Sequence, residues 1–177
     1  MRTSSLSPAR RIATALLLAV AVLASGARAP GAAPTDAPPP AASASALVIV
    51  VGAQSPLHDI SRKTLRRAYS GELSEEQGTR LVPLNQPPGS AARVAFDRTL
   101  LGLEPDAIAR FWIDQRIRGQ GSAPRAIPNV ALLLRVLAQL PGGVSYVRRS
   151  DLPASAPGVK VLTIDGKKPG DPGYLFP

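Results

Sequence analysis

One short run of aliphatic residues constrains the fold more than any other feature of the sequence. Residues 47–51 read LVIVV, without the alternating polar positions of a half-exposed strand. A strand that lacks a polar face is covered by other elements on both sides, which is typical of the central sheet of an α/β protein. We therefore expect a sheet with helices packed against each of its faces.

The remaining pattern supplies those helices and further strands. Ser61, Ser90 and Asn129 each precede a stretch with apolar residues at helical spacing, as helix-capping residues do, and Pro105 stands in the first turn of another predicted helix. Further strands are predicted at 80–84, 144–147 and 159–164. This order predicts an α/β fold whose sheet is largely parallel at its start.

The composition excludes several classes of function. The 177 residues include no Cys and one His, which rules out disulfides, thiol chemistry, zinc–thiolate sites and multi-histidine metal cages. His58 stands beside Asp59, but adjacent side chains rarely point the same way, and no G-x-S-x-G nucleophile motif is present. We therefore expect no enzyme, no metal and no cofactor, and we interpret His58 as a surface residue.

The N-terminal segment predicts export. Three arginines precede an apolar run at 12–24, and small residues follow it, which is the layout of a secretory signal peptide. The run is shorter than the ~20 residues that span a bilayer, and an uncleaved anchor is the alternative. Without Cys a lipoprotein is excluded, so we expect a periplasmic protein with no stable membrane insertion after the signal is removed.

These features divide the chain into three parts. The signal peptide is assigned to 1–27, with cleavage after residue 27 or 29. Residues 28–46 contain five Pro and no large apolar side chain, so they cannot repay the entropy of ordering and are expected to be a disordered Ala/Pro-rich leader. The folded domain is assigned to 47–177.

The positive charge of the chain does not indicate a nucleic-acid partner. From Arg28 onward 18 basic and 12 acidic residues leave a net charge of +6. Paired basic residues occur without interleaved aromatic residues, and no nucleic-acid-binding motif is visible. We interpret the charge as a general attraction for anions.

One loop offers an anion site. Pro87-Pro88-Gly89-Ser90 joins a predicted strand to a predicted helix, and such a junction presents backbone N–H groups and the positive end of the helix to anions such as phosphate or sulfate. Arg93 adds a cation one turn into the helix. The alternative is an ordinary helix cap followed by a solvated arginine.

Six ordered segments carry a family resemblance. Together with Phe111-Trp112, these segments resemble the second lobe of phosphate transporter substrate-binding proteins. Those proteins are type II periplasmic binding proteins. The resemblance covers 47–174 and implies a single three-layer αβα lobe of that fold. The segments are LVIVV (47–51), ISRKTLRRAYSG (60–71), GTRLVPL (78–84), GSAARVAF (89–96), RGQGSAP (118–124) and PGGVSYV (141–147).

The resemblance also implies a ligand-binding loop. In the family an Arg followed by Ser-Gly-Thr binds the phosphate oxygens, and here Gln86 stands in place of the Arg, with Ala91 and Ala92 in place of the Gly and Thr. A charged donor and a hydroxyl are therefore lost, which should weaken binding. The implied ligand-binding residues are Gln86, Gly89, Ser90, Ala91, Ala92 and Arg93.

Two functions follow as expectations. The first is an exported solute-binding-like domain that binds phosphate or a related oxyanion and serves phosphate uptake or sensing. Its partners would be an ABC permease or a second lobe-like chain, because a lone lobe holds an anion on an open surface. The second is a non-catalytic periplasmic interaction module in which the anion site has eroded.

Overall fold

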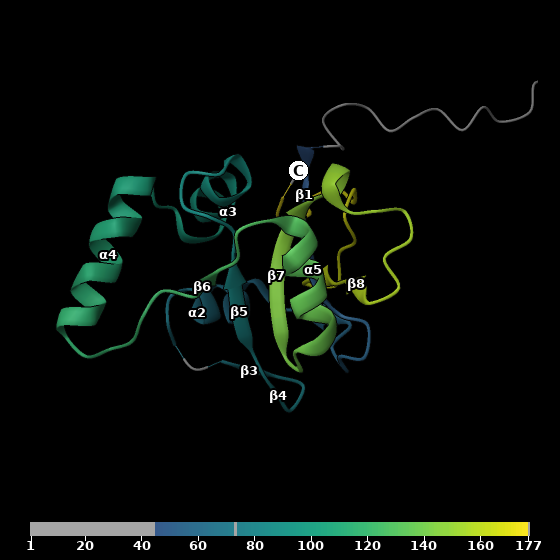
Figure 1. The fold of residues 1–177 in the computed structure, drawn as a ribbon, viewed down its shortest axis with the longest axis horizontal. Helices are drawn as coiled ribbons and strands as arrows, with labels where there is room; N and C mark the ends of the chain where they lie inside the picture. Colours follow the sequence, from purple (N-terminus) through teal and green to yellow (C-terminus); the bar gives the residue numbers. More distant parts are fainter. Residues whose placement is uncertain (1–44, 73, 177) are drawn as a thin grey trace, which may run out of the picture. The chain divides into compact units, whose positions relative to one another are not determined.

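The all-apolar strand predicted at 47–51 lies inside a five-stranded sheet (Figure 1). The computed structural model describes residues 45–72 and 74–176, and in it β1 (Leu47–Gly52) is buried along its whole length. The strand order is β6-β5-β7-β1-β8. The immediate neighbours of β1 are thus β7 (Gly143–Arg148) and β8 (Val159–Val161).

The strand directions correct one expectation. β5 (Val82–Asn85) is parallel to both β6 (Arg125–Ala126) and β7, but β1 is antiparallel to each of its neighbours. The prediction that the sheet is largely parallel at its start is therefore wrong. The physical reason for the difference is pairing at long range. β1 pairs with two strands from the C-terminal third of the domain and not with the strand that follows it in the sequence.

Helices cover both faces of the sheet. α5 (Val130–Gln139) packs on β1 and β7 from one side and lies in front of them in Figure 1. α2 (Arg62–Tyr69) and α3 (Ala91–Leu101) pack on the other side, and α4 (Pro105–Ile117) packs on α3. This arrangement confirms the predicted three-layer αβα architecture.

The side chains of β1 alternate between two separate hydrophobic clusters. Val48 and Val50 join a cluster with the α5 residues Leu133 and Leu137, and we call this side of the sheet the aliphatic face. On the opposite side, buried aromatic rings from α2, α3 and β7 form the larger cluster, and we call this side the network face, after the polar contacts described below. Its aromatic members include Tyr69, Phe96, Trp112, Tyr146 and Tyr174.

The predicted helix caps are confirmed. The Ser61 side chain accepts a hydrogen bond from the Thr64 N–H at 3.0 Å, and the Asn129 side chain accepts one from the Leu132 N–H at 2.8 Å. Pro105 occupies the first turn of α4. These caps are local interactions between a side chain and the backbone three residues away, which is why the sequence alone located them.

Short elements complete the domain. The predicted strand at 159–164 divides at the buried Leu162 into β8 and β9 (Thr163–Ile164), and β9 pairs in parallel with β2 (Asp59–Ile60). A small hairpin is formed by β3 (Glu75–Glu76) and β4 (Thr79–Arg80). A single 3-10 turn, η1 (Arg149–Asp151), follows β7.

The predicted signal peptide at 1–27 and nearly all of the leader at 28–46 lie outside the described residues. Within 45–72 and 74–176, no helix combines the length and the apolar character needed to cross a membrane.

Candidate functional site

The predicted anion site lies in the loop that leads from β5 into α3. We call this loop, residues 86–90, the anion loop. Gly89 adopts φ +77°, a left-handed conformation that a residue with a side chain rarely adopts. The Ser90 N–H donates to the Pro87 carbonyl at 3.2 Å, and the Ser90 hydroxyl accepts from the Arg93 N–H at 3.3 Å. The loop is therefore a tight turn that ends in an ordinary N-cap.

Two donors remain free at this helix start. Within the part of the chain that the structure describes, the N–H groups of Ala91 and Ala92 have no hydrogen-bond partner, because the first bonded amides of α3 are those of Arg93 and Val94. Ala91 is exposed, whereas Ala92 packs into the core with its side chain. Unpaired N–H groups at the positive end of a helix form an anion-binding position.

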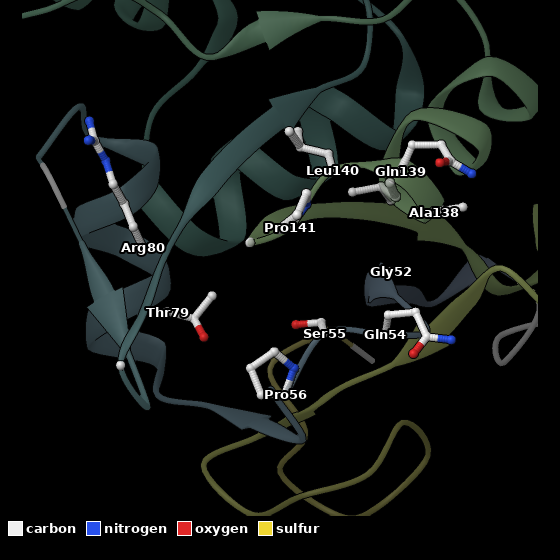
Figure 2. A pocket seen from close by; sticks show the side chains of 13 residues that line it. Gly52, Gln54, Ser55, Pro56, Thr79, Arg80, Ala138, Gln139, Leu140 and Pro141 are labelled. Carbon is white, nitrogen blue, oxygen red and sulfur yellow. The ribbon is translucent and has the colours of Figure 1, made fainter.

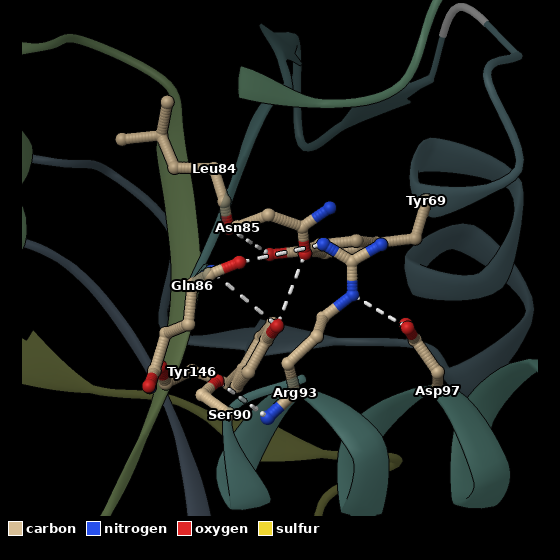
Figure 3. A network of polar contacts seen from close by, with 8 residues as sticks. All are labelled: Tyr69, Leu84, Asn85, Gln86, Ser90, Arg93, Asp97 and Tyr146. Carbon is tan, nitrogen blue, oxygen red and sulfur yellow. Dashed lines mark hydrogen bonds and ion pairs between the residues drawn. The ribbon is translucent and has the colours of Figure 1, made fainter. Parts of the chain in front are cut away.

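Gln86 does not face this position. Its side-chain amide donates to the Tyr146 carbonyl at 2.9 Å, and its backbone N–H lies 3.5 Å from the Tyr146 hydroxyl (Figure 3). Only 7% of the residue is exposed. The structure thus places Gln86 in the core, where it ties the loop to β7.

Arg93 is also turned inward. Its guanidinium Nε donates to the Asp97 carboxylate at 2.5 Å, and its Nη1 lies 3.5 Å from the Gln86 carbonyl. Both side chains of this ion pair are nearly inaccessible, with 9% and 6% of their surface exposed. The alternative of a solvated arginine is therefore wrong, and the positive charge of Arg93 is balanced inside the protein by Asp97.

Tyrosines connect this pair to the sheet (Figure 3). The Tyr146 hydroxyl donates to the Asn85 side chain at 3.1 Å, and the Tyr69 hydroxyl donates to the Leu84 carbonyl at 2.9 Å. The ring of Phe96 stacks on Tyr146 with centroids 3.8 Å apart. These hydrogen bonds and ring contacts hold the side chains beneath the anion loop in one arrangement.

Burial sets the ionisation of these groups. Desolvation raises the pKa of Tyr69 and of Tyr146, so both phenols stay neutral in the folded domain. Desolvation also raises the pKa of the Asp97 carboxyl, an effect that the hydrogen bond and charge of Arg93 oppose. The network therefore presents no net charge to the loop above it.

Sequence reasoning missed most of this network. It named Gln86 and Arg93 but assigned no role to Tyr69, Asn85, Asp97 or Tyr146. One signal was present: Arg93 and Asp97 stand four residues apart, the spacing at which opposite charges meet on a helix. Nothing in that spacing indicates that the pair is buried, because burial depends on the strand that the helix covers.

The other candidates lie elsewhere. His58 is exposed, as its interpretation as a surface residue requires. The neighbouring Asp59 side chain accepts hydrogen bonds from the Thr163 hydroxyl and, at 2.9 Å, from the Gly166 N–H, so it organises the turn beside β9. Within 45–72 and 74–176, no three His, Cys, Asp or Glu side chains are grouped closely enough to hold a metal ion.

One hollow in the described part of the chain lies away from the anion loop. A pocket of about 480 Å³ opens at the end of β1, between Gly52, the β4 residue Arg80 and the C-terminal end of α5 (Figure 2). The strands β5 and β7 begin beside this pocket, while the anion loop follows the other end of β5. The pocket therefore lies at the N-terminal ends of β5 and β7, and the anion loop lies at the opposite, C-terminal end of β5.

The sequence matches no protein-family model and no curated protein sequence. The structure resembles an ABC-type phosphate transport receptor from Vibrio cholerae, with a TM-score of 0.51, 14% identity, and coverage of 70% of this chain and 48% of that chain. It also resembles a putative phosphate ABC transporter substrate-binding protein with bound phosphate from Clostridium perfringens, with a TM-score of 0.53, 12% identity, and coverage of 70% and 46%.

The chain thus spans about half the length of these solved structures. At these identities the likeness concerns the fold. The mixed sheet and the helices on its two faces match one half of a phosphate-binding type II periplasmic binding protein. This agrees with the single lobe that the sequence motifs imply.

Proposed function

We propose that this domain binds phosphate or a related oxyanion at the start of α3, as an exported solute-binding-like protein of the periplasm. The observation that carries the proposal is the pair of unpartnered N–H groups at Ala91 and Ala92, beside the hydroxyl of Ser90. The two similar proteins are described as a phosphate transport receptor and a phosphate-bound substrate-binding protein, which favours the same ligand class. No catalytic role is proposed.

Weak affinity follows from the donor set. Arg93 is paired with Asp97, and Gln86 is bonded to Tyr146, so the ligand would meet neutral donors and the helix dipole. Neutral hydrogen bonds are about half as strong as those made by a charged donor. On an open surface, salt screening reduces the attraction further, and we expect binding in the millimolar range.

A second chain would strengthen this binding. Closing a water-free cleft over the anion lowers the local dielectric constant and raises the strength of every polar contact. The chain spans about half of the proteins it resembles, so the covering surface would come from a partner, either a lobe-like chain or a transporter permease. In that assembly the domain would serve phosphate uptake or sensing.

A second candidate is an interaction module without a ligand. The observation that favours it is that both side chains expected to help bind the anion, Gln86 and Arg93, make internal contacts instead. An anion site that has lost its charged donor would leave a rigid surface loop, which suits docking to another protein.

Amide chemical shifts separate the two candidates. The ¹⁵N-labelled protein is titrated with phosphate, with sulfate and with chloride at matched ionic strength. Anion binding predicts saturable shifts at Ala91 and Ala92 with phosphate or sulfate but not with chloride. The absence of saturable shifts at tens of millimolar phosphate would leave the interaction module as the function.

One substitution tests the free N–H groups directly. Ala91→Pro removes a donor at the first helical position, where proline fits the helix. Loss of one hydrogen bond to a charged ligand predicts about tenfold weaker phosphate binding. The matched control is Val130→Pro at the first position of α5, which should leave the phosphate titration unchanged.

A further inference from the structure

The outward face of α4 carries large apolar side chains that nothing in the described part of the chain covers. α4 packs on α3, and its residues Ile108 and Trp112 belong to the hydrophobic cluster of the network face. Ile113 and Ile117 stand one turn apart on the other side of the helix and are 57% and 78% exposed. Figure 1 shows α4 at the outer edge of the domain, where this face is open to solvent.

Arginines surround the two isoleucines. Arg110 stands one turn before the first of them, and Arg116 and Arg118 flank the second. All three are exposed, and none forms an ion pair within residues 45–72 and 74–176. Three arginines against Asp114 give the stretch 110–118 a net charge of +2. We call five of these exposed residues the α4 patch: Arg110, Ile113, Arg116, Ile117 and Arg118.

The charge of the α4 patch decides what can cover it. A second copy of the chain would bring two positive patches together, and like charges that lose their water in an interface repel each other. The neighbouring acidic residues do not reverse the sign, because Asp106 lies in the first turn, at the other end of α4. The segment 116–126 contains a further arginine, Arg125, and no acidic residue. The covering surface is therefore negatively charged.

The size of the α4 patch favours a lipid surface over a protein. A standard protein interface takes about 800 Å² and roughly 20–30 residues from each partner, whereas the α4 patch is five side chains on one convex helix. A bilayer needs no matching groove. Apolar side chains enter its interfacial layer, while arginine stems lie along that layer and the guanidinium groups bind lipid phosphates.

We propose that the α4 patch binds the domain to the surface of an anionic phospholipid bilayer. Ile113 and Ile117 enter the interfacial layer, and the three arginines bind the lipid phosphates. The binding is peripheral, because it requires no membrane-spanning helix. It is also independent of the free N–H groups at the start of α3, because the α4 patch points away from α3.

Sedimentation with vesicles tests the proposal on the full protein. One set of vesicles is phosphatidylcholine, and in the other about a third of the lipid is phosphatidylglycerol. We expect the protein to sediment with the anionic vesicles and not with the neutral ones, and added salt should weaken the binding.

Substitution of the isoleucines tests the apolar part of the α4 patch. Ile113→Ser and Ile117→Ser should each weaken vesicle binding roughly tenfold. Both positions are exposed, and isoleucine and serine have similar helix propensities, so α4 should stay folded. The matched control is Val82→Thr, because Val82 of β5 is the third exposed large apolar residue in the described part of the chain. This variant should bind like the natural protein.

Removal of one arginine tests the charge. Arg116→Gln should weaken binding to anionic vesicles about fivefold. Arg135→Gln removes the same charge from an exposed position of α5, on the other side of the sheet, and should bind like the natural protein. Ala91→Pro, which removes a donor of the anion site, should also leave vesicle binding unchanged.

Four results would overturn the proposal. Absence of sedimentation with anionic vesicles at low salt would do so, and capture by immobilised polyglutamate in that case would assign the α4 patch to an acidic protein. Unchanged binding by both serine variants would place the contact elsewhere. Equal losses for Arg116→Gln and Arg135→Gln would mean attraction by overall charge. Loss of binding in Ala91→Pro would place the lipid phosphate on the anion loop. None of the first three results affects the anion proposal, which the phosphate titration tests.

Discussion

The two faces of the sheet are covered by different kinds of side chain. On the aliphatic face, α5 covers β1 with Val and Leu side chains, and the buried cluster that the structure describes there holds no ionisable group. On the network face, an ion pair and two tyrosine hydroxyls lie under α2 and α3 among aromatic rings. β1 contributes alternate residues to each, so one strand supports both environments.

The two kinds of contact contribute differently to the stability of the domain and to the position of the anion loop. An aliphatic face gains free energy in proportion to the apolar area that it buries. A buried polar network gains little in net terms, because desolvation offsets its hydrogen bonds and charges, but it tolerates few alternative arrangements. On the network face it fixes Gln86 and Arg93, which flank the anion loop. Apolar burial on both faces stabilises the domain, and the polar network on one of them holds the loop in one conformation.

The largest effect is expected when the network loses one charge. Arg93→Ala leaves the Asp97 carboxylate buried without its partner, and we expect the free energy of unfolding to fall by about 3–5 kcal/mol. Urea unfolding measures it. The control is Arg67→Ala, which breaks the exposed pair with Glu72 and should cost less than about 1 kcal/mol. Equal losses in both variants would mean that burial of the Arg93 pair carries no energetic weight.

A large effect of another kind is expected on the aliphatic face. Leu133 of α5 is fully buried against the sheet, so Leu133→Ala should lower the free energy of unfolding by about 2–5 kcal/mol through lost burial and a cavity. The amide shifts of Gln86 and Ala91 should stay unchanged, because no polar partner is removed. Altered shifts in the anion loop would show that the two faces are coupled through the sheet.

Alkaline pH should destabilise the domain through the network face alone. All three tyrosines of the chain lie in its cluster, and burial raises the pKa of Tyr174 to about 12. A raised pKa in the folded state favours the neutral phenol, so its stabilisation is complete below pH 10 and is lost as pH rises toward 12.

The loss for Tyr174 alone is about 2–3 kcal/mol once both pKa values are exceeded. Urea unfolding between pH 9 and 12, with absorbance at 295 nm to follow phenolate formation, checks it. Tyrosine ionisation near pH 10 in the folded protein would contradict the burial of these rings.

A smaller effect is expected when one hydroxyl is removed. Tyr146→Phe keeps the ring stacked on Phe96 but leaves the buried Asn85 side chain and the Gln86 N–H without this partner, which should cost about 1–3 kcal/mol. Hydrogen exchange at the Gln86 amide should become faster than in the natural protein. Unchanged exchange at Gln86 would show that the tyrosine does not hold the loop.

The sequence was sufficient for local features and insufficient for distant ones. The caps at Ser61, Ser90 and Asn129 and the buried strand at 47–51 were predictable, because each depends on neighbouring residues or on periodicity. The direction of β1 was not, because the same apolar pattern suits a parallel or an antiparallel interior strand.

The candidate site divides in the same way. The loop at 86–93 was located from its glycine and its helix start. The inward turn of Arg93 and Gln86 was not predictable, because their partners Asp97 and Tyr146 meet them only when α3 covers β7. A hollow between α3 and α4 was likewise not predictable, since residues of two helices and of the separate segment before β6 line it.

The position of β1 has a consequence for biosynthesis. Leu47 pairs with Arg148, and Val50 pairs with Val161, so both flanking strands are translated long after β1. A nascent chain therefore carries a bare uncharged segment, rich in β-branched residues, that is prone to self-association until its last portion emerges. Pairing at such long range also slows folding, because the loop-closure entropy is lost before the strands pair.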